Sequence, residues 1–151
     1  MYKIFLSFIL IASVGVKSMH HESHDHNPQD AKSVVKQAYE TFGSGDTEAW
    51  SALHADDLVF TVFGNIATSG IHIGPDAVIK NVFEPIAVHW PKFTITHKAM
   101  YSDGNMVFVH SDMTADGLDT ETMHMFKVEN GIIQSFTAFD DTDSMASADV
   151  K

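Results

Sequence analysis

The segment that most restricts the fold runs from 122 to 142 and has the sequence "TMHMFKVENGIIQSFTAFDDT". Two runs of alternating residues flank the dipeptide Asn130-Gly131, which is the strongest short signal for a β-hairpin turn. His124 interrupts the otherwise apolar first strand, and two consecutive aspartates close the second. The segment therefore predicts an antiparallel hairpin with ionisable groups at the end away from its turn.

Helical patterns precede the strands. Asp30 is a suitable N-cap for the first helix, Pro75 suits the first turn of a later helix after a loop at 70–74, and Pro91 prevents that helix from continuing. The tail at 143–151 has little to bury. Helices are expected at 30–43, 47–54 and 75–90, and strands at 56–64, 92–102, 106–115 and in both arms of the hairpin. This order predicts an α+β domain with helices packed on one face of a curved antiparallel sheet.

The N-terminus has the pattern of an export signal. Lys3 precedes an apolar run at 4–16, which is 13 residues long and therefore suits a signal-peptide core better than a membrane span. Cleavage after Ser18 fits the preference for small residues, and an uncleaved anchor is the alternative. We expect a signal peptide at 1–18, a flexible segment at 19–29, one domain at 30–142 and a tail at 143–151. The mature protein would be periplasmic or secreted, with no membrane attachment.

The flexible segment is rich in histidine. Imidazoles and carboxylates in one mobile stretch bind Zn, Cu or Ni with little geometric selectivity. Cleavage after Ser18 would place a histidine third in the mature chain, an arrangement suited to square-planar Cu(II) or Ni(II). A solubilising linker is the alternative. The candidate metal ligands are His20, His21, His24 and His26. The other histidines lack metal-ligand spacing, so we expect no structural metal and no cofactor.

Composition excludes several classes of function. The chain has no cysteine, which rules out a disulfide framework and thiol chemistry. Its 44% hydrophobic residues are enough for a packed core. Nine basic residues against twenty acidic ones give a net charge of −11, which opposes binding to nucleic acid or to an anionic membrane.

Three phrases in the right order resemble the SnoaL-like group of the nuclear transport factor 2-like superfamily, which is related to polyketide cyclases and ketosteroid isomerase. They are "GSGDTEAW...ADDLVFTVFG", "GPDAVIKNVFEPIAVHWPKF" and "HMFKVENGIIQSFTAFDDT". The resemblance covers residues 30–142 and implies a cone: a curved sheet wrapped around a long N-terminal helix, with a mostly apolar pocket at one end. It does not imply one reaction, because the superfamily contains several enzyme classes and many non-enzymes.

The ketosteroid isomerases use an aspartate base and an oxyanion hole made of a tyrosine and a neutral carboxylic acid. By position, the base falls on Val62, which cannot exchange a proton. The tyrosine falls on Ala38, with Tyr39 beside it on a different side of the helix, and the acid falls on His124. That mechanism is therefore not expected. The imidazole of His124 can act as acid, base or orienting donor, and a satisfied core histidine is the alternative.

The register of the hairpin decides which aspartate accompanies His124, because neighbouring strand residues face opposite sides. If two residues alone form the turn, Asp141 shares the face of His124. If the turn is a three-residue loop with Gly131 in the left-handed region, Ala138 and Asp140 share that face. The isomerase resemblance favours the second register, whereas an Asp-Thr pair that is common in SnoaL-like sequences points to Asp141. We prefer Asp140 for the pocket wall and Asp141 for the rim, and both are candidate catalytic residues with His124.

The same alternation predicts a pocket face and an outer face for the sheet. The outer face would carry Met106, Phe108, Met123 and Met125, and an apolar outer face is expected to be covered by a second copy in a homodimer. The candidate pocket residues are Tyr39, Val62, Phe63, Phe83, Trp90, Val109, Ser111, Phe136 and Ala138. The expected function is binding of a small, largely apolar molecule, with isomerase-, cyclase- or lyase-type proton transfer through His124. A non-catalytic binding or dimerisation module is the alternative.

Overall fold

The structure is a computed structural model that describes residues 30–151. The expected signal peptide and histidine-rich segment lie outside these residues. The helices are α1 (Ala31–Ser44), α2 (Thr47–Ala52), α3 (Pro75–Val78), the π-helical turn η1 (Ile79–Phe83), α4 (Glu84–His89) and α5 (Thr142–Ser147). The strands are β1 (His54–Val62), β2 (Gly70–Ile73), β3 (Thr94–Asp103), β4 (Met106–Ala115), β5 (Leu118–Glu129) and β6 (Ile132–Asp140). None of these helices is long and apolar enough to cross a membrane.

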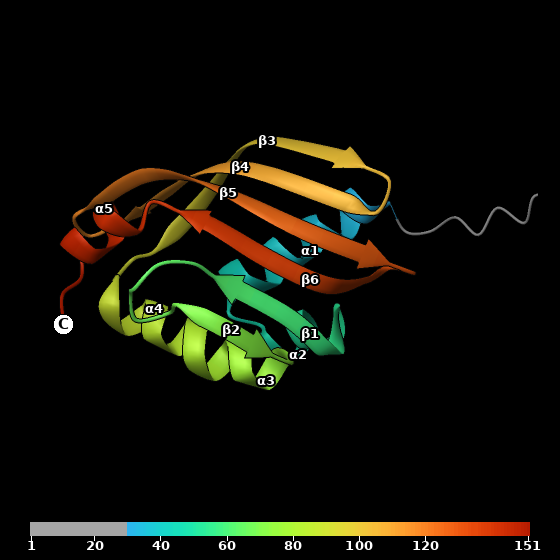
Figure 1. Cartoon of the computed structure of the whole chain (residues 1–151), viewed down its shortest axis with the longest axis horizontal. Helices are drawn as coiled ribbons and strands as arrows, with labels where there is room; N and C mark the ends of the chain where they lie inside the picture. The colour runs from blue at the N-terminus through green and yellow to red at the C-terminus, as the bar shows by residue number, and fades with distance from the viewer. Residues whose placement is uncertain (1–29) are drawn as a thin grey trace, which may run out of the picture.

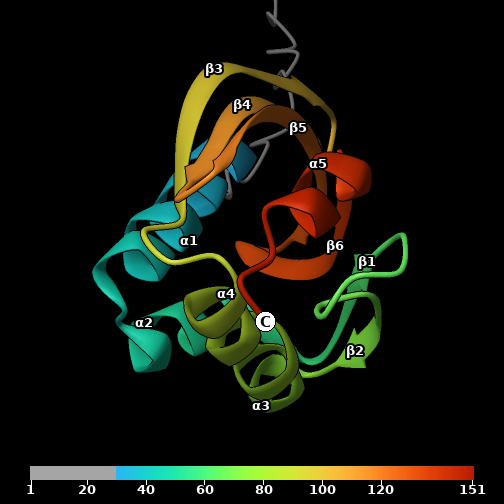
Figure 2. The same cartoon turned by 90° about the vertical axis from the view of Figure 1, so that its left-hand side faces the viewer.

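The six strands form one curved sheet in the order β2-β1-β6-β5-β4-β3. All neighbours are antiparallel except β1 and β6, which run parallel. The α+β class is confirmed, while the expectation of a wholly antiparallel sheet is wrong at this one pair. Figures 1 and 2 show β3, β4 and β5 arching over α1, with α3 and α4 below the other half of the sheet. The sheet and helices together enclose the interior of the domain.

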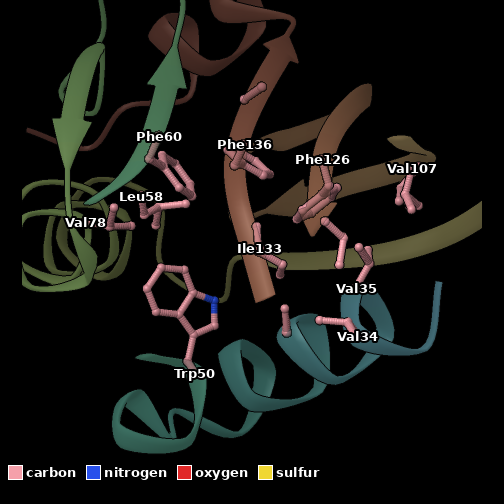
Figure 3. Packing of buried hydrophobic residues seen from close by; sticks show 14 of the residues in the cluster. Val34, Val35, Trp50, Leu58, Phe60, Val78, Val107, Phe126, Ile133 and Phe136 are labelled. Carbon is pink, nitrogen blue, oxygen red and sulfur yellow. The ribbon is translucent and has the colours of Figure 1, made fainter. Parts of the chain in front are cut away.

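Helix α1 fills the concave side of the sheet. The Asp30 side chain accepts a hydrogen bond from the backbone N–H of Lys32, and Gly45 adopts φ 72° just past the helix end, so both termini are capped as their sequence predicts. Val34 and Val35 are fully buried on the inner stripe. Figure 3 shows them projecting from α1 towards the sheet, in the same apolar cluster as Ile133 of β6. This packing holds the next turn of α1 over the end of the sheet that carries the candidate site.

The segment between β1 and β3 differs from the expectation in two ways. Residues 70–73 form strand β2 rather than a loop, because they pair antiparallel with the edge of β1. The expected single helix contains the π-helical turn η1, in which the backbone N–H of Glu84 bonds to the carbonyl of Ile79. Pro85 has no N–H to continue a regular α-helical ladder, which accounts for the irregularity just before it.

The C-terminal tail is part of the fold, contrary to the expectation that it has little to bury. Met145 of α5 is buried in a second apolar cluster with Trp90, Met113 and Leu118. The indole Nε1 of Trp90 donates to the carbonyl of Met145 at 2.8 Å. A short helix of this kind has little stability alone and depends on such tertiary contacts. Its presence closes one end of the interior.

Candidate functional site

The turn of the hairpin matches the two-residue alternative. Asn130 and Gly131 have φ values of 52° and 78°, and Glu129 pairs with Ile132 across them. Two consecutive left-handed residues define the type I′ geometry that Asn-Gly prefers, because asparagine and glycine tolerate positive φ. With a regular ladder, this turn would place Asp141 on the face of His124.

A β-bulge two residues beyond the turn changes that outcome. Val128 pairs with Ile133, but Lys127 pairs with Ser135, so Gln134 has no partner across the ladder. One extra residue on one strand reverses which side chains share a face. His124 therefore lies opposite Ala138. The turn is therefore the expected two-residue turn. The side chains nevertheless face as expected for the three-residue loop, with Asp140 on the inner side.

A cavity opens on this inner side, between the sheet and the helices. Its volume is about 70 Å³, which is small beside the roughly 300–1,000 Å³ of most ligand pockets. Five of the expected pocket residues line it: Tyr39, Val62, Phe83, Phe136 and Ala138. The rings of Phe60 and Phe136 stack at 4.0 Å between their centroids, and Figure 3 shows both projecting into the interior from β1 and β6. The wall of the cavity is predominantly apolar and aromatic.

Four ionisable or hydroxyl side chains meet in this apolar wall. The Oη of Tyr39 lies 2.7 Å from Nδ1 of His124, and Nε2 of His124 lies 3.4 Å from Oδ1 of Asp140. The hydroxyl of Thr122 also donates to Oδ1 of Asp140, at 2.5 Å. His124 is only 5% exposed. The result is a hydroxyl, an imidazole and a carboxylate in line at one end of the cavity, which we call the Tyr39–His124–Asp140 chain.

The protonation of the chain follows from its surroundings. Burial works to raise the pKa of the Asp140 carboxyl, but the hydrogen bond and charge of His124 and the hydrogen bond from Thr122 outweigh it, so the pKa lies below its usual value. Burial, followed by the charge of Asp140, raises the pKa of the Tyr39 phenol far above its ordinary value. A carboxylate only accepts hydrogen bonds, so in the uncharged form of the His124 ring Nε2 carries the proton and donates to Asp140, and Nδ1 accepts the hydrogen bond from the Tyr39 hydroxyl.

Tyr39 reaches the chain although the family tyrosine position falls on Ala38. Its ring makes an edge contact with His97 at 4.1 Å and with Phe126 at 5.6 Å between centroids. These ring contacts hold the phenol in place. Tyr39 therefore supplies a hydroxyl to the cavity from one position later in the helix.

Three of the expected site residues lie outside the cavity. Asp141 is exposed and caps α5, because its side chain accepts from the backbone N–H of Ser144 at 3.1 Å. Phe63 is 53% exposed, since strand alternation turns it away when Val62 points inward. Trp90 is buried in the second apolar cluster. The expectation that Phe63 and Trp90 line the pocket is wrong, whereas Asp141 lies just past the end of its strand, where it was expected at the rim rather than in the pocket wall.

Val109 and Ser111 lie on the inner face of β4, as strand alternation predicts, but they are packed behind the lining of the cavity. Both are fully buried, and they pair with His124 and Thr122 of β5. The Oγ of Ser111 is the one fully buried side-chain polar atom without a hydrogen-bond partner in the described part of the chain. These residues support the strand that carries His124 rather than form the wall.

His54 lines the cavity and was not among the expected site residues. Its Nδ1 lies 2.7 Å from the carbonyl oxygen of Trp50, and the two rings stack at 3.8 Å between centroids. Burial lowers the pKa of His54 to about 4, against the opposing effect of the hydrogen bond to Trp50. The residue lies at the end of an expected helix and belongs to no motif. Its spacing of four residues from an inward tryptophan is the signal that could have indicated it.

Residues 30–151 contain no group of three or more histidine, cysteine, aspartate or glutamate side chains placed to hold a metal ion. The candidate ligands His20, His21, His24 and His26 are outside this range.

Solved structures with the same architecture define the class of the fold. A nuclear transport factor 2-like protein of Burkholderia thailandensis is 24% identical, with 78% of this chain and 95% of that chain covered and a TM-score of 0.68. A second, of Burkholderia pseudomallei and of unknown function, is 21% identical, with coverage of 80% and 98% and a TM-score of 0.72. IdmH of Streptomyces antibioticus, a candidate polyketide cyclase, is 18% identical, with coverage of 79% and 97% and a TM-score of 0.68. The chain has the nuclear transport factor 2-like fold.

The family is narrower than the fold. The model of the SnoaL-like domain family matches residues 35–136, which contain all of α1 after its first turn and most of the sheet. The chain belongs to the SnoaL-like family. A search of curated proteins found no match.

Proposed function

We propose that this SnoaL-like domain binds a small, largely apolar molecule in the cavity and transfers a proton on it through the Tyr39–His124–Asp140 chain. The observation that carries the proposal is the contact of Tyr39 Oη with His124 Nδ1 at 2.7 Å, with Asp140 behind the imidazole and an apolar cavity in front. Polar groups in line within an apolar cavity are typical of a binding or catalytic site.

The arrangement supports transfer of a proton from the ligand to the protein, followed by its return. Tyr39 Oη accepts a proton from the ligand while its own proton passes to Nδ1 of His124, which becomes an imidazolium beside the Asp140 carboxylate. The carboxylate orients the imidazole and stabilises its positive charge, which is the role of the acid in a hydroxyl–imidazole–carboxylate triad. The reverse movement returns a proton to the ligand at another atom. This cycle is the chemistry of an isomerase, a cyclase or a lyase.

Two further observations are consistent with this class of reaction. Val62 lines the cavity where the steroid isomerases carry their base, so a different base is needed, and Tyr39 with His124 supplies one. The candidate polyketide cyclase IdmH shares the fold. At 18% identity it supports the choice of reaction class and no particular substrate.

Hydrogen exchange at carbon tests the proposal without knowledge of the natural substrate. Cyclopentanone in D₂O loses its α-proton signals when a catalyst abstracts these protons, and proton NMR follows the loss. We expect the wild-type protein to accelerate exchange, and His124→Phe and Asp140→Asn to lower the rate by about 100-fold or more. His110→Phe is the matched control, because His110 contacts Glu121 on the outer face at 2.6 Å. Equal rates for wild type and His124→Phe would disprove proton transfer through this chain.

A non-catalytic binding protein is the second candidate. The apolar Val62 and the small cavity volume of about 70 Å³ favour it, because neither requires turnover. Native mass spectrometry of the purified protein would detect a retained ligand. A ligand that binds tightly and undergoes no exchange in the wild-type protein would assign this function.

The outer face of the sheet supports a homodimer. Val59, Phe63, Ile71, Ile73 and Phe139 are exposed there, and the rings of Phe63 and Phe139 lie 5.6 Å apart. This patch lies over β1, β2 and β6, whereas Met106, Phe108, Met123 and Met125 of β4 and β5 are partly buried. We propose that a second copy covers the patch. Light scattering that gives a monomer would exclude it.

Two proposals concern residues 1–29, outside the described part of the chain. We propose export with cleavage after Ser18, which N-terminal sequencing of the mature protein would test. We also propose that the histidine-rich segment binds Cu(II) or Ni(II). Identical visible spectra of wild type and His21→Ala during copper titration would exclude the square-planar site.

A further inference from the structure

The cavity has a second polar position that the Tyr39–His124–Asp140 chain does not use. His54 lines the cavity at the start of β1 and is 6% exposed. Its Nδ1 lies 2.7 Å from the carbonyl oxygen of Trp50 and its ring stacks on the indole, so its position and orientation are fixed. The imidazole is therefore held in one orientation in the cavity wall.

The contact with Trp50 determines which nitrogen carries the proton. A carbonyl oxygen only accepts hydrogen bonds, so Nδ1 is protonated and donates to it. In the neutral ring, Nε2 then holds a lone pair. Among residues 30–151, Nε2 of His54 has no hydrogen-bond partner, and it is not among the fully enclosed atoms that lack one. Burial keeps the pKa of His54 at about 4, so the ring is neutral at pH 7. His54 thus offers the cavity an acceptor.

An aromatic wall extends from this acceptor to the other polar end. Trp50 lies 6.5 Å from Phe60, Phe60 stacks on Phe136 at 4.0 Å, and Phe136 lies 4.8 Å from His124, all between ring centroids. Figure 3 shows Trp50, Phe60 and Phe136 along this wall. The far end also presents an acceptor, because Oδ2 of Asp140 has no hydrogen-bond partner in the described part of the chain. The cavity is an aromatic slot with hydrogen-bond acceptors at two places.

We propose that Nε2 of His54 is a recognition site for an O–H or N–H group of the ligand, which makes the ligand an uncharged ring compound with a hydroxyl or amine away from the reacting atom. This inference rests on the proposed function for the reacting end and adds the ligand class. An anion is disfavoured, because its negative charge would face the lone pairs of both free acceptors, Nε2 of His54 and Oδ2 of Asp140. A hydrocarbon is disfavoured as well, because it would leave Nε2 buried without a partner.

The matched probes phenol and toluene test the inference, because they differ only in a hydroxyl or a methyl group on the same ring. Isothermal titration calorimetry gives the dissociation constant of each. We expect wild type to prefer phenol by about 10-fold, as for one hydrogen bond in a buried site. We expect the ¹⁵N resonance of His54 Nε2 to move upfield with phenol and not with toluene.

Two variants remove the acceptor in different ways. His54→Asn retains a donor for the Trp50 carbonyl and lacks Nε2, and His54→Phe retains a ring to stack on the indole. Both should have a clearly lower preference for phenol over toluene than wild type, because the acceptor of His54 is gone and only that of Asp140 remains. His72→Asn is the control, since His72 bonds through Nε2 to the carbonyl of Thr68 at 3.0 Å, also four residues earlier, and does not line the cavity. It should keep the preference.

The outcomes separate this inference from the proposed proton transfer. A phenol preference that is as large in either His54 variant as in wild type, or that wild type lacks, overturns the inference. A lower preference in both His54 variants supports it, whatever the exchange rate of cyclopentanone. His124→Phe should abolish exchange and leave the phenol preference unchanged, so failure of proton transfer appears only in the exchange assay.

Discussion

His124 and His54 are buried to nearly the same degree in one cavity, yet their ring nitrogens contact different partners. His124 lies between a phenol and a carboxylate, so both nitrogens are in hydrogen bonds to groups that can carry or stabilise charge. His54 contacts a backbone carbonyl and an indole, neither of which stabilises an imidazolium as a carboxylate does. The comparison indicates that the hydrogen-bond partners, rather than the degree of burial, determine which histidine suits the proposed proton transfer and which suits the proposed hydrogen bond to the ligand.

Removal of the Tyr39 hydroxyl should have the largest effect on this contrast. Tyr39→Phe retains the ring contacts with His97 and Phe126 and breaks the 2.7 Å contact with Nδ1 of His124. We expect the rate of cyclopentanone exchange to fall by about 100-fold or more, while the free energy of unfolding falls by only about 1 kcal/mol. Proton NMR and calorimetry measure the two effects. An unchanged exchange rate would show that the hydroxyl does not take part.

Acid should reveal the environment of His54. Because its folded-state pKa of about 4 is below the unfolded value of 6.5, the unfolded chain binds more protons between these values, and stability is lost as the pH falls from 6.5 towards 4. Urea unfolding at pH 7 and pH 4.5 should show wild type losing about 2 to 3 kcal/mol more than His54→Asn. Both proteins share all other titrating groups. Equal losses would contradict the lowered pKa.

The smallest effect is expected at the neighbouring aspartate. Asp141→Ala removes the N-cap of α5 and should cost about 1 kcal/mol of stability. It should leave cyclopentanone exchange unchanged, in contrast to Asp140→Asn. Urea unfolding and the exchange assay give the two readings. If Asp141→Ala lost the exchange activity while circular dichroism showed an intact helix content, Asp141 would have a role in the reaction despite its exposed position.

Much of the fold could be predicted because its signals are local. Asp30 as a cap, Pro75 at a helix start and Asn130-Gly131 at the turn act through their own backbone. Strand β2 and helix α5 could not, because each is short and is stabilised by partners distant in the sequence: β1 for the strand and Trp90 for the helix. Local sequence patterns therefore predict the main helices and the hairpin, but not β2 and α5, which depend on tertiary contacts.

The site was predictable in part for the same reason. His124 stood out as a polar residue in an apolar strand, and Asp140 was the preferred aspartate. The bulge that turns Asp140 inward has no sequence signal at Gln134. Asp140 therefore faces the cavity as expected, but because of this bulge rather than a three-residue turn. His54 was missed because its role depends on the stacking with Trp50 and on the cavity, both of which are tertiary.

The unpaired Gln134 has a consequence for the comparison of this chain with its relatives. A relative with the same number of residues in this strand but no bulge would have a regular ladder from the same turn, and the next aspartate along the strand would face the cavity. Two homologous proteins could then use different positions of an alignment for one chemical role. An alignment without gaps through β6 would pair a cavity residue with a surface residue, so functional assignments across the family need the strand pairing as well as the sequence.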